Sequence, residues 1–209
     1  MMESKMFEYI CETPAVLTDI INRREEITKD FVSHFKDVEI EQIYVIGSGT
    51  SYHAGLAAKL YLEELLGIKV FNMYPTQFAR EEKVFNQKTL VIGMSQGGQS
   101  LSTVEGLDSA RERGLHTAAV SENPSALIFE HADTSTKMGN EKCGAKTKGY
   151  AGTTATLMMM LTELAIAKGM ATEEKAAGYR ERMFRVIGNL GKVTDAAVEW
   201  YKRIKDEFL

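Results

Sequence analysis

Five short apolar runs alternate with helical segments along the middle of the chain, and this alternation constrains the fold most. The runs are IYVIG at 43–47, KVFNMY at 69–74, TLVIGMS at 89–95, HTAAVS at 116–121 and ADTSTKM at 132–138. Strands that alternate with helices form a parallel sheet whose connections cross over its faces. The runs at 43–47 and 89–93 are almost continuously apolar, which is typical of central strands covered on both faces. The sequence therefore predicts an α/β fold, a three-layer α/β/α sandwich around a five-stranded parallel sheet.

Helical segments are expected on both sides of this unit. Thr13 and Pro14 favour a helix start, because the hydroxyl can cap and a proline at the first position loses no hydrogen bond. Apolar residues then recur at helical spacing as far as Phe35, and a second apolar stripe follows Thr172. Gly188 and Gly191 leave open whether that last segment is one helix or two. We expect an N-terminal helical segment at 1–40, the α/β domain at 41–170 and a C-terminal helical appendage at 171–209.

Charge and composition exclude several kinds of partner. The 209 residues carry a net charge of −4 with acidic and basic residues interspersed, so no basic stripe exists to bind nucleic acid or an anionic membrane. Cys11 and Cys143 match no metal-ligand or redox spacing, and we expect both to be free thiols. Charged residues interrupt the N-terminus before an apolar region of signal-peptide length develops, and the apolar stretch at 155–167 is too short to span a bilayer. We expect a cytoplasmic protein.

Two loops are the candidate ligand sites. In an open parallel sheet, ligands bind at the carboxyl ends of the strands, which selects GSGTSYHAG at 47–55 and SQGGQSLS at 95–102. Both loops combine hydroxyl groups with backbone N–H groups at a helix start, and such donors suit an anion. Neither loop contains the lysine of a nucleotide-binding P-loop. The pattern indicates a site in which neutral donors bind the phosphate group of a small phosphorylated substrate.

The same loops are compatible with other interpretations. The first resembles a dinucleotide-binding fingerprint, but Tyr52 occupies the third glycine position and the strand at 69–74 ends without an acidic residue. A second alternative is that the glycines of this loop serve only to form the turn between a strand and a helix, without binding a ligand. The second contains GMSQG at 93–97, so a serine hydrolase with His131 and Asp108 or Asp133 is a further alternative, although the glycines after Ser95 prolong the loop beyond a nucleophile elbow.

Three segments carry a family resemblance. GSGTSYHAGLAAKLYLE, GMSQGGQSLSTVEGL and EKCGAKTKGYAGTTATL resemble the sugar-isomerase (SIS) domain, and the similarity runs from about Met6 to Gly169. Within the family the chain looks most like the first SIS domain in the isomerising part of glucosamine-6-phosphate synthase and in the related fructosamine-6-phosphate deglycases. The resemblance implies a flavodoxin-like domain, a phosphorylated sugar such as fructose 6-phosphate or a fructosamine 6-phosphate as ligand, and no metal or organic cofactor.

Site residues follow from the loops and from the resemblance. We expect phosphosugar contacts from Ser48, Gly49, Thr50, Ser51, Ser95, Gln96, Gly97, Ser100, Ala145 and Lys148. The family usually has a serine where this chain has Gly97, a glutamate at Gln99 and a serine at Lys146. One hydroxyl donor is therefore replaced by bare backbone in the second loop.

Catalysis is less well defined by the sequence. Aldose–ketose isomerisation moves a proton between neighbouring carbons and needs a carboxylate or an imidazole within reach of both. The candidates are His53, Glu64 and Glu141. We expect a phosphosugar isomerase or deglycase, or the substrate-binding half of one. The alternative is a non-catalytic sensor of sugar phosphates. Apolar stripes on the first and last helices further predict a homodimer or a larger homo-oligomer.

Overall fold

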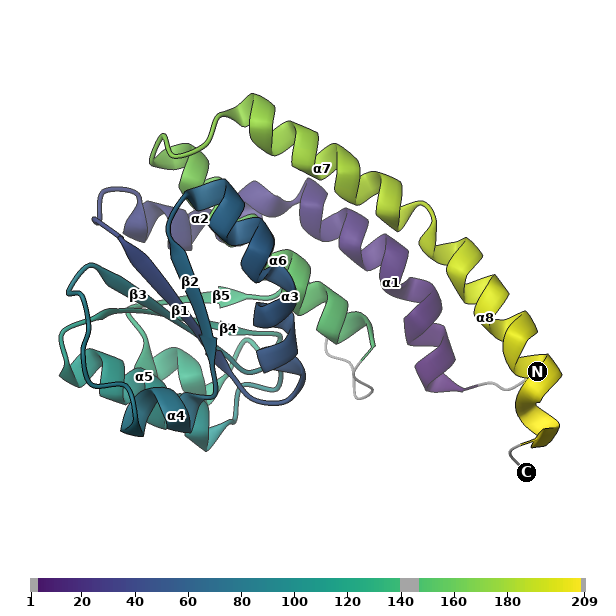
Figure 1. Ribbon diagram of the computed structural model, residues 1–209, viewed down its shortest axis with the longest axis horizontal. Helices are drawn as coiled ribbons and strands as arrows, with labels where there is room; N and C mark the ends of the chain where they lie inside the picture. The colour runs from purple at the N-terminus through teal and green to yellow at the C-terminus, as the bar shows by residue number, and fades with distance from the viewer. Residues whose placement is uncertain (1–3, 140–146, 208–209) are drawn as a thin grey trace.

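The computed structural model describes residues 4–139 and 147–207, and its centre is a five-stranded parallel sheet (Figure 1). The strands are β1 (Gln42–Gly47), β2 (Lys69–Met73), β3 (Thr89–Met94), β4 (His116–Ser121) and β5 (Thr134–Lys137), in the order β2-β1-β3-β4-β5. β1 and β3 are central, and β3 is buried along its whole length. The predicted α/β class and the five parallel strands are confirmed.

Helices cover both faces of the sheet and make it a sandwich. One face packs against α2 (Arg24–Phe35), α3 (Thr50–Leu66) and α6 (Lys148–Ala167), and the largest apolar cluster lies there. The other face packs against α4 (Pro75–Arg80), α5 (Leu101–Glu112) and the short 3-10 helix η1 (Leu127–His131). Side chains of β1 alternate between the two clusters, with Val45 on the first face and Tyr44 and Ile46 on the second. This alternation is the period of two of a strand covered on both faces.

The N-terminal segment differs from the expectation of one helix beginning at Thr13. α1 spans Lys5–Asn22 with Pro14 inside it, and α2 begins at Arg24. A proline inside a helix removes one hydrogen bond, yet the Thr13 and Thr18 hydroxyls bond back to the carbonyls of Tyr9 and Pro14 within the same helix. In the continuous helix, Ile20 and Ile21 pack against Met159 of α6 and Ile187 of α7, and this packing stabilises α1. Tertiary contacts therefore override the local start signal.

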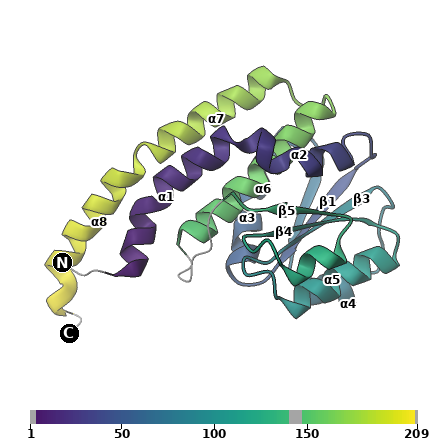
Figure 2. The same ribbon diagram turned by 180° about the vertical axis from the view of Figure 1, so that it is seen from behind.

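The C-terminal segment forms two helices in line. α7 (Glu173–Ile187) begins directly after Thr172, where the sequence indicated the start of the second apolar stripe, and the Thr172 hydroxyl caps the helix by accepting the Lys175 N–H at 3.2 Å. α8 (Leu190–Ile204) follows after Gly188 and Asn189, and the short 3-10 helix η2 (Lys205–Glu207) follows α8. α1 runs antiparallel beside α7 and α8, and we call these three helices the arm (Figures 1 and 2). The start of α1 and the end of α8 lie at its tip, away from the sheet.

Candidate functional site

The two candidate loops leave the sheet side by side. β1 and β3 pair in parallel, with Gly47 opposite Met94, so both strands end at the same edge. The first loop runs into α3 at Thr50, and the second runs into α5 at Leu101. Two helix N-termini therefore converge on one edge of the sheet, and the positive ends of the two helix dipoles make this edge a favourable setting for an anion.

A chain of hydroxyl groups connects the two loops. The Ser48 Oγ lies 3.4 Å from the Ser102 Oγ, which in turn lies 3.1 Å from the Ser100 Oγ. Ser100 caps α5, since its Oγ accepts the Thr103 N–H at 3.4 Å and the Thr103 hydroxyl at 3.0 Å. Ser102 was not among the predicted residues, and its place in this chain follows from the packing of the two loops. Hydroxyls grouped in this way can donate to a shared phosphate.

The first loop turns sharply before α3. Gly49 has a φ of 56°, a conformation that favours glycine, and a Cβ built there would have no atom within 4 Å. Thr50 and Ser51 form the first turn of α3, where Ser51 is buried and its N–H donates to the Ser48 carbonyl at 3.2 Å. The open space over Gly49 lets a ligand approach the backbone, while Ser48 and Thr50 beside it are accessible.

The second loop is held from beneath by β4. The Ser95 Oγ accepts the Gly98 N–H at 3.1 Å, and the Ser95 N–H donates to the Val120 carbonyl at 3.1 Å. Gly98 has a φ of 76°, and a Cβ there would lie 2.2 Å from the Ala126 Cβ. Gly97, by contrast, is exposed with open space around it. The backbone of the loop is therefore fixed on its inner side and accessible at Gly97.

A buried carboxylate stands behind the second loop. The Gln96 Nε2 donates to the Glu122 Oε2 at 2.9 Å, and the Glu122 N–H donates to the Gln96 carbonyl at 3.1 Å. Glu122 is 3% exposed and comes directly after β4. Sequence reasoning missed Glu122, although a polar residue directly after a strand of the sheet was a signal for it. The first bond orients the side-chain amide of Gln96, and the second holds the backbone of Gln96 against the end of β4.

The hydrolase alternative finds no support in the geometry. Among the described residues, no histidine contacts the Ser95 hydroxyl. His131 instead lies with its Nδ1 2.7 Å from the Asp108 Oδ1, in a pair between η1 and the later part of α5. A hydroxyl without a base in contact is not an activated nucleophile. The GMSQG sequence therefore belongs to an ordinary strand-to-loop turn.

Two of the three candidate acid or base residues, His53 and Glu64, lie in the part of the chain that the structure describes, and they do not meet at the loops. Glu64 lies 14 residues along α3 from Thr50, roughly 20 Å at 1.5 Å per residue, and its carboxylate contributes to the raised pKa of the Tyr179 hydroxyl of α7. His53 lies on the exposed side of the first turn of α3, where it lines a hollow of about 460 Å³ with Thr50, Leu56, Ala57 and Tyr150. Glu141 lies outside the described residues, as does Ala145 of the predicted ligand set. Only His53 is placed beside the first loop.

Lys148 has its own partners in the structure. It is the first residue of α6 and is buried, and its ammonium group lies 2.5 Å from the Glu12 Oε2 and 4.5 Å from the centre of the Tyr9 ring, both on α1. Its role as a phosphosugar contact stays a prediction. The contact with Glu12 means that a phosphate drawing on this ammonium would share it with the carboxylate of α1.

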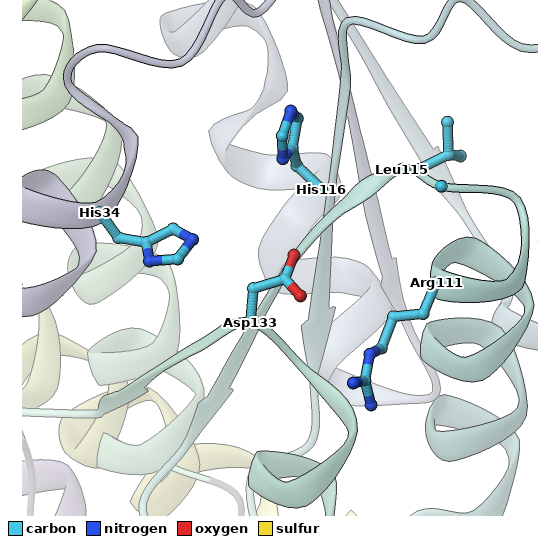
Figure 3. Close-up of a pocket in the computed structure, with 6 residues that line it drawn as sticks. His34, Arg111, Leu115, His116 and Asp133 are labelled. Atoms are coloured by element: carbon cyan, nitrogen blue, oxygen red, sulfur yellow. The ribbon is translucent and has the colours of Figure 1, made fainter.

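A second polar hollow lies at the opposite, amino-terminal edge of the sheet. Its lining includes His34, Arg111, His116 and Asp133, and Figure 3 shows these basic side chains around the Asp133 carboxylate. That carboxylate accepts the Thr117 N–H at 2.8 Å, and the Asp133 N–H donates to the Thr117 hydroxyl at 3.0 Å. A carboxylate at the centre disfavours a phosphate here. We therefore place the candidate site at the carboxyl edge.

Curated proteins similar to this chain cover nearly its whole length. A glutamine–fructose-6-phosphate aminotransferase (isomerizing) from Fusobacterium nucleatum is 28% identical over 96% of this chain and 35% of its own length. The enzyme of the same name from Gloeobacter violaceus is 32% identical over 97% of this chain and 34% of its own length. This chain thus spans about a third of the curated relatives that it matches.

A solved structure matches closely as well. A proposed phosphosugar isomerase from Clostridium difficile 630 superposes with a TM-score of 0.87 at 32% identity, over 97% of this chain and 58% of that chain. The family model described as the SIS domain matches residues 38–164, which is more than half of the chain and contains both loops. This chain belongs to the SIS-domain family.

Proposed function

We propose that the chain binds a phosphorylated sugar at the carboxyl edge of its sheet, with the phosphate held by the loops at 47–51 and 95–102. The observation that carries the proposal is the convergence of two helix N-termini whose loops are linked by the Ser48, Ser102 and Ser100 hydroxyls. Hydroxyl and backbone N–H donors at helix starts bind phosphate without a cation in the motif.

The relatives suggest the class of sugar. The two curated relatives carry fructose 6-phosphate in their names, and the solved neighbour is described as a phosphosugar isomerase. A ketose 6-phosphate or an amino-sugar derivative is therefore the ligand that we propose for this chain. Its phosphate would lie at the two helix starts, with the sugar ring extending over Gly49 and Gly97, where the backbone is open.

Isothermal titration with fructose 6-phosphate tests this proposal. Ser51→Ala and Ser100→Ala each remove one hydroxyl at the loops, and a lost hydrogen bond to a charged group should raise the Kd about tenfold or more. Ser33→Ala on α2 is the matched control, because its exposed hydroxyl lies on another element, and it should leave the Kd unchanged. Wild-type protein that binds fructose 6-phosphate no better than fructose would contradict the proposal.

The reaction that we propose is isomerisation or deglycation, and one observation favours a second candidate, a sensor without catalysis. Of the expected acids and bases that fall within the described residues, Glu64 is remote from the loops and only His53 stands beside them. Incubation with fructose 6-phosphate in deuterated water separates the two functions. Deuterium appearing on a sugar carbon, and lost in His53→Gln, identifies an enzyme with His53 as its base. Saturable binding with no label on carbon identifies a sensor.

A further inference from the structure

The polar hollow at the amino-terminal edge of the sheet, opposite the two candidate loops, has no part in the proposed sugar binding. It has a volume of about 520 Å³, which is within the usual range of sites for small molecules. Four elements contribute its titratable side chains. His34 comes from the last turn of α2 and Arg111 from the last turn of α5, while His116 begins β4 and Asp133 directly precedes β5.

The Asp133 carboxylate is fixed at the centre of this hollow. Its Oδ2 accepts the Thr117 N–H at 2.8 Å, and the Asp133 N–H donates in return to the Thr117 hydroxyl at 3.0 Å. The other carboxylate oxygen, Oδ1, accepts no hydrogen bond from any residue that the structure describes, and Asp133 is exposed. A negative charge is therefore held in a defined orientation, with one oxygen accessible to a ligand.

Arg111 supplies the opposite charge. Figure 3 shows its guanidinium group on one side of the Asp133 carboxylate, with the His34 and His116 rings on other sides. Within the described parts of the chain, the Arg111 side chain makes no hydrogen bond or ion pair, so it is not joined to Asp133. An arginine can hold a carboxylate through two parallel hydrogen bonds. A cation and an anion thus face one shared space without direct contact between them.

The remaining lining suits a small organic molecule with a positively charged group. Leu115 forms a buried apolar part of the wall. The rings of His34 and His116 lie against Phe35, with centroid distances of 4.6 Å and 6.2 Å, so one buried aromatic side chain supports both imidazoles. α2 and α5 both end at this edge of the sheet, and the carbonyl ends of helices favour a cation.

We infer that this hollow binds a free α-amino acid, whose ammonium group bonds to Asp133 and whose carboxylate bonds to Arg111. An α-amino acid carries both charges on one carbon, and its charges complement those of the two side chains. A simple carboxylate or a phosphate meets a like charge at Asp133, and a simple amine meets a like charge at Arg111. The described residues offer no group of three or more His, Cys, Asp or Glu side chains for a metal ion.

An NMR titration of the labelled whole chain, without any sugar phosphate, tests the inference. L-Alanine, L-leucine and L-glutamine should each shift the amide signals of 114–117 and 133 in a saturable way, because the recognised charges are common to all three. N-acetyl-L-alanine lacks the ammonium group, and L-alaninamide lacks the carboxylate. Each analogue should bind about tenfold more weakly than L-alanine or worse, because one charge-assisted hydrogen bond is lost.

Two variants identify the charges. Asp133→Asn keeps an acceptor for the Thr117 N–H but removes the negative charge, and Arg111→Gln removes the positive charge from an exposed position. Each should raise the Kd for L-alanine about tenfold or more. Lys29→Gln removes an exposed positive charge of α2 outside the hollow and should leave this Kd unchanged.

The same titrations give the results that would overturn the inference. It fails if none of the three amino acids produces saturable shifts at the hollow. Equal Kd values for L-alanine and its two analogues overturn it as well, because the two charges would then not be recognised. Wild-type affinity in both Asp133→Asn and Arg111→Gln has the same consequence. The spectra themselves report whether each variant is folded, so a loss of binding through unfolding is recognised directly.

Discussion

Gly98 is the residue whose backbone the second loop depends on most. Its φ of 76° is costly for any L side chain, and an added Cβ would lie 2.2 Å from the Ala126 Cβ and 2.8 Å from the Ala126 Cα. We expect Gly98→Ala to lower the free energy of unfolding by about 2 kcal/mol or more, through backbone strain and overpacking together. Urea denaturation measures this change.

Gly97→Ala is the matched control for this prediction. The neighbouring glycine has no positive φ and open space for a Cβ, so its substitution should change the free energy of unfolding by less than about 0.5 kcal/mol. Equal destabilisation by both substitutions would contradict the geometry described for the loop.

The residues of the site were predictable from the sequence to different degrees. Ser48, Thr50 and Ser100 follow from the rule that ligand loops begin where parallel strands end. Ser102 and Glu122 were missed because their roles depend on side chains that meet across loops, Ser102 with Ser48 and Glu122 with Gln96. The spacing of residues within one motif gives no information on contacts between side chains of different loops. Glu64 was predicted as a candidate base but lies near the end of α3, far from the loop that precedes this helix.

At the scale of elements, one largely buried carboxylate connects α2, α6 and α7. The Glu163 Oε1 of α6 lies 2.9 Å from the Arg24 Nε and 3.7 Å from the Arg180 Nη1, and the Glu163 and Arg180 side chains are 13% and 9% exposed. Burial raises the pKa of Glu163, and the two arginines oppose that shift. Glu163→Ala leaves two largely desolvated guanidinium groups with one partner fewer. We expect it to lower the free energy of unfolding by about 2–3 kcal/mol.

An exposed ion pair of α8 is the control for the buried one. The Lys202 Nζ lies 2.6 Å from the Glu199 Oε1, and both side chains are largely exposed. Glu199→Ala should therefore cost about 0.5 kcal/mol or less, because water screens the pair. Thermal and urea unfolding of the two variants should differ clearly. A Glu163→Ala variant as stable as the wild type would show that α6 and α7 do not depend on this contact.

The contact between α3 and α7 predicts a loss of stability in alkali. Burial, with a hydrogen bond to Glu64, raises the pKa of the Tyr179 hydroxyl to about 12, above its ordinary value of about 10. The unfolded chain loses this proton first, so the contribution is fully present below about pH 10 and is lost as pH rises toward 12. The urea midpoint should fall over this range.

Tyr179→Phe tests the assignment to this residue. Burial also raises the pKa of Tyr61 and of Tyr44, so the wild type should retain some alkaline dependence from other tyrosines. The difference between wild type and variant isolates Tyr179, and the variant should lose less stability between pH 10 and 12. Identical pH profiles would show that Tyr179 ionises as freely in the folded state as in the unfolded chain.

The elements themselves were largely predictable, with an exception at the N-terminus. The strands agree with their apolar runs because a parallel sheet buried on both faces leaves little freedom in composition. The sequence signal at Pro14 predicted a start of α1 that is about nine residues too late. The helix continues through the proline because its following turns pack on α6 and α7. Local start signals act over one turn, whereas such packing acts over the whole length of the helix.

At the scale of the whole molecule, different features of the sequence predict the sheet and the helices of the arm. The alternation of strands and helices predicts the layers, but the strand order β2-β1-β3-β4-β5 rests on pairing between distant segments. The apolar stripes predicted helices at both ends, whereas their antiparallel packing beside each other depends on contacts between α1, α7 and α8. The division of the chain at residues 40 and 170 stays a prediction. No helix among the described residues is both long and apolar enough to cross a membrane.

The central claim is that the carboxyl-edge loops hold a sugar phosphate, and an NMR titration of the labelled chain tests it most directly. With fructose 6-phosphate, amide shifts should change in a saturable way at 48–51 and 95–102, and the changes should be smaller with fructose or with inorganic phosphate. The hollow at the amino-terminal edge, which includes His34 and His116, should stay unchanged. Shifts confined to that hollow, or no saturable shifts at either loop, would contradict the account.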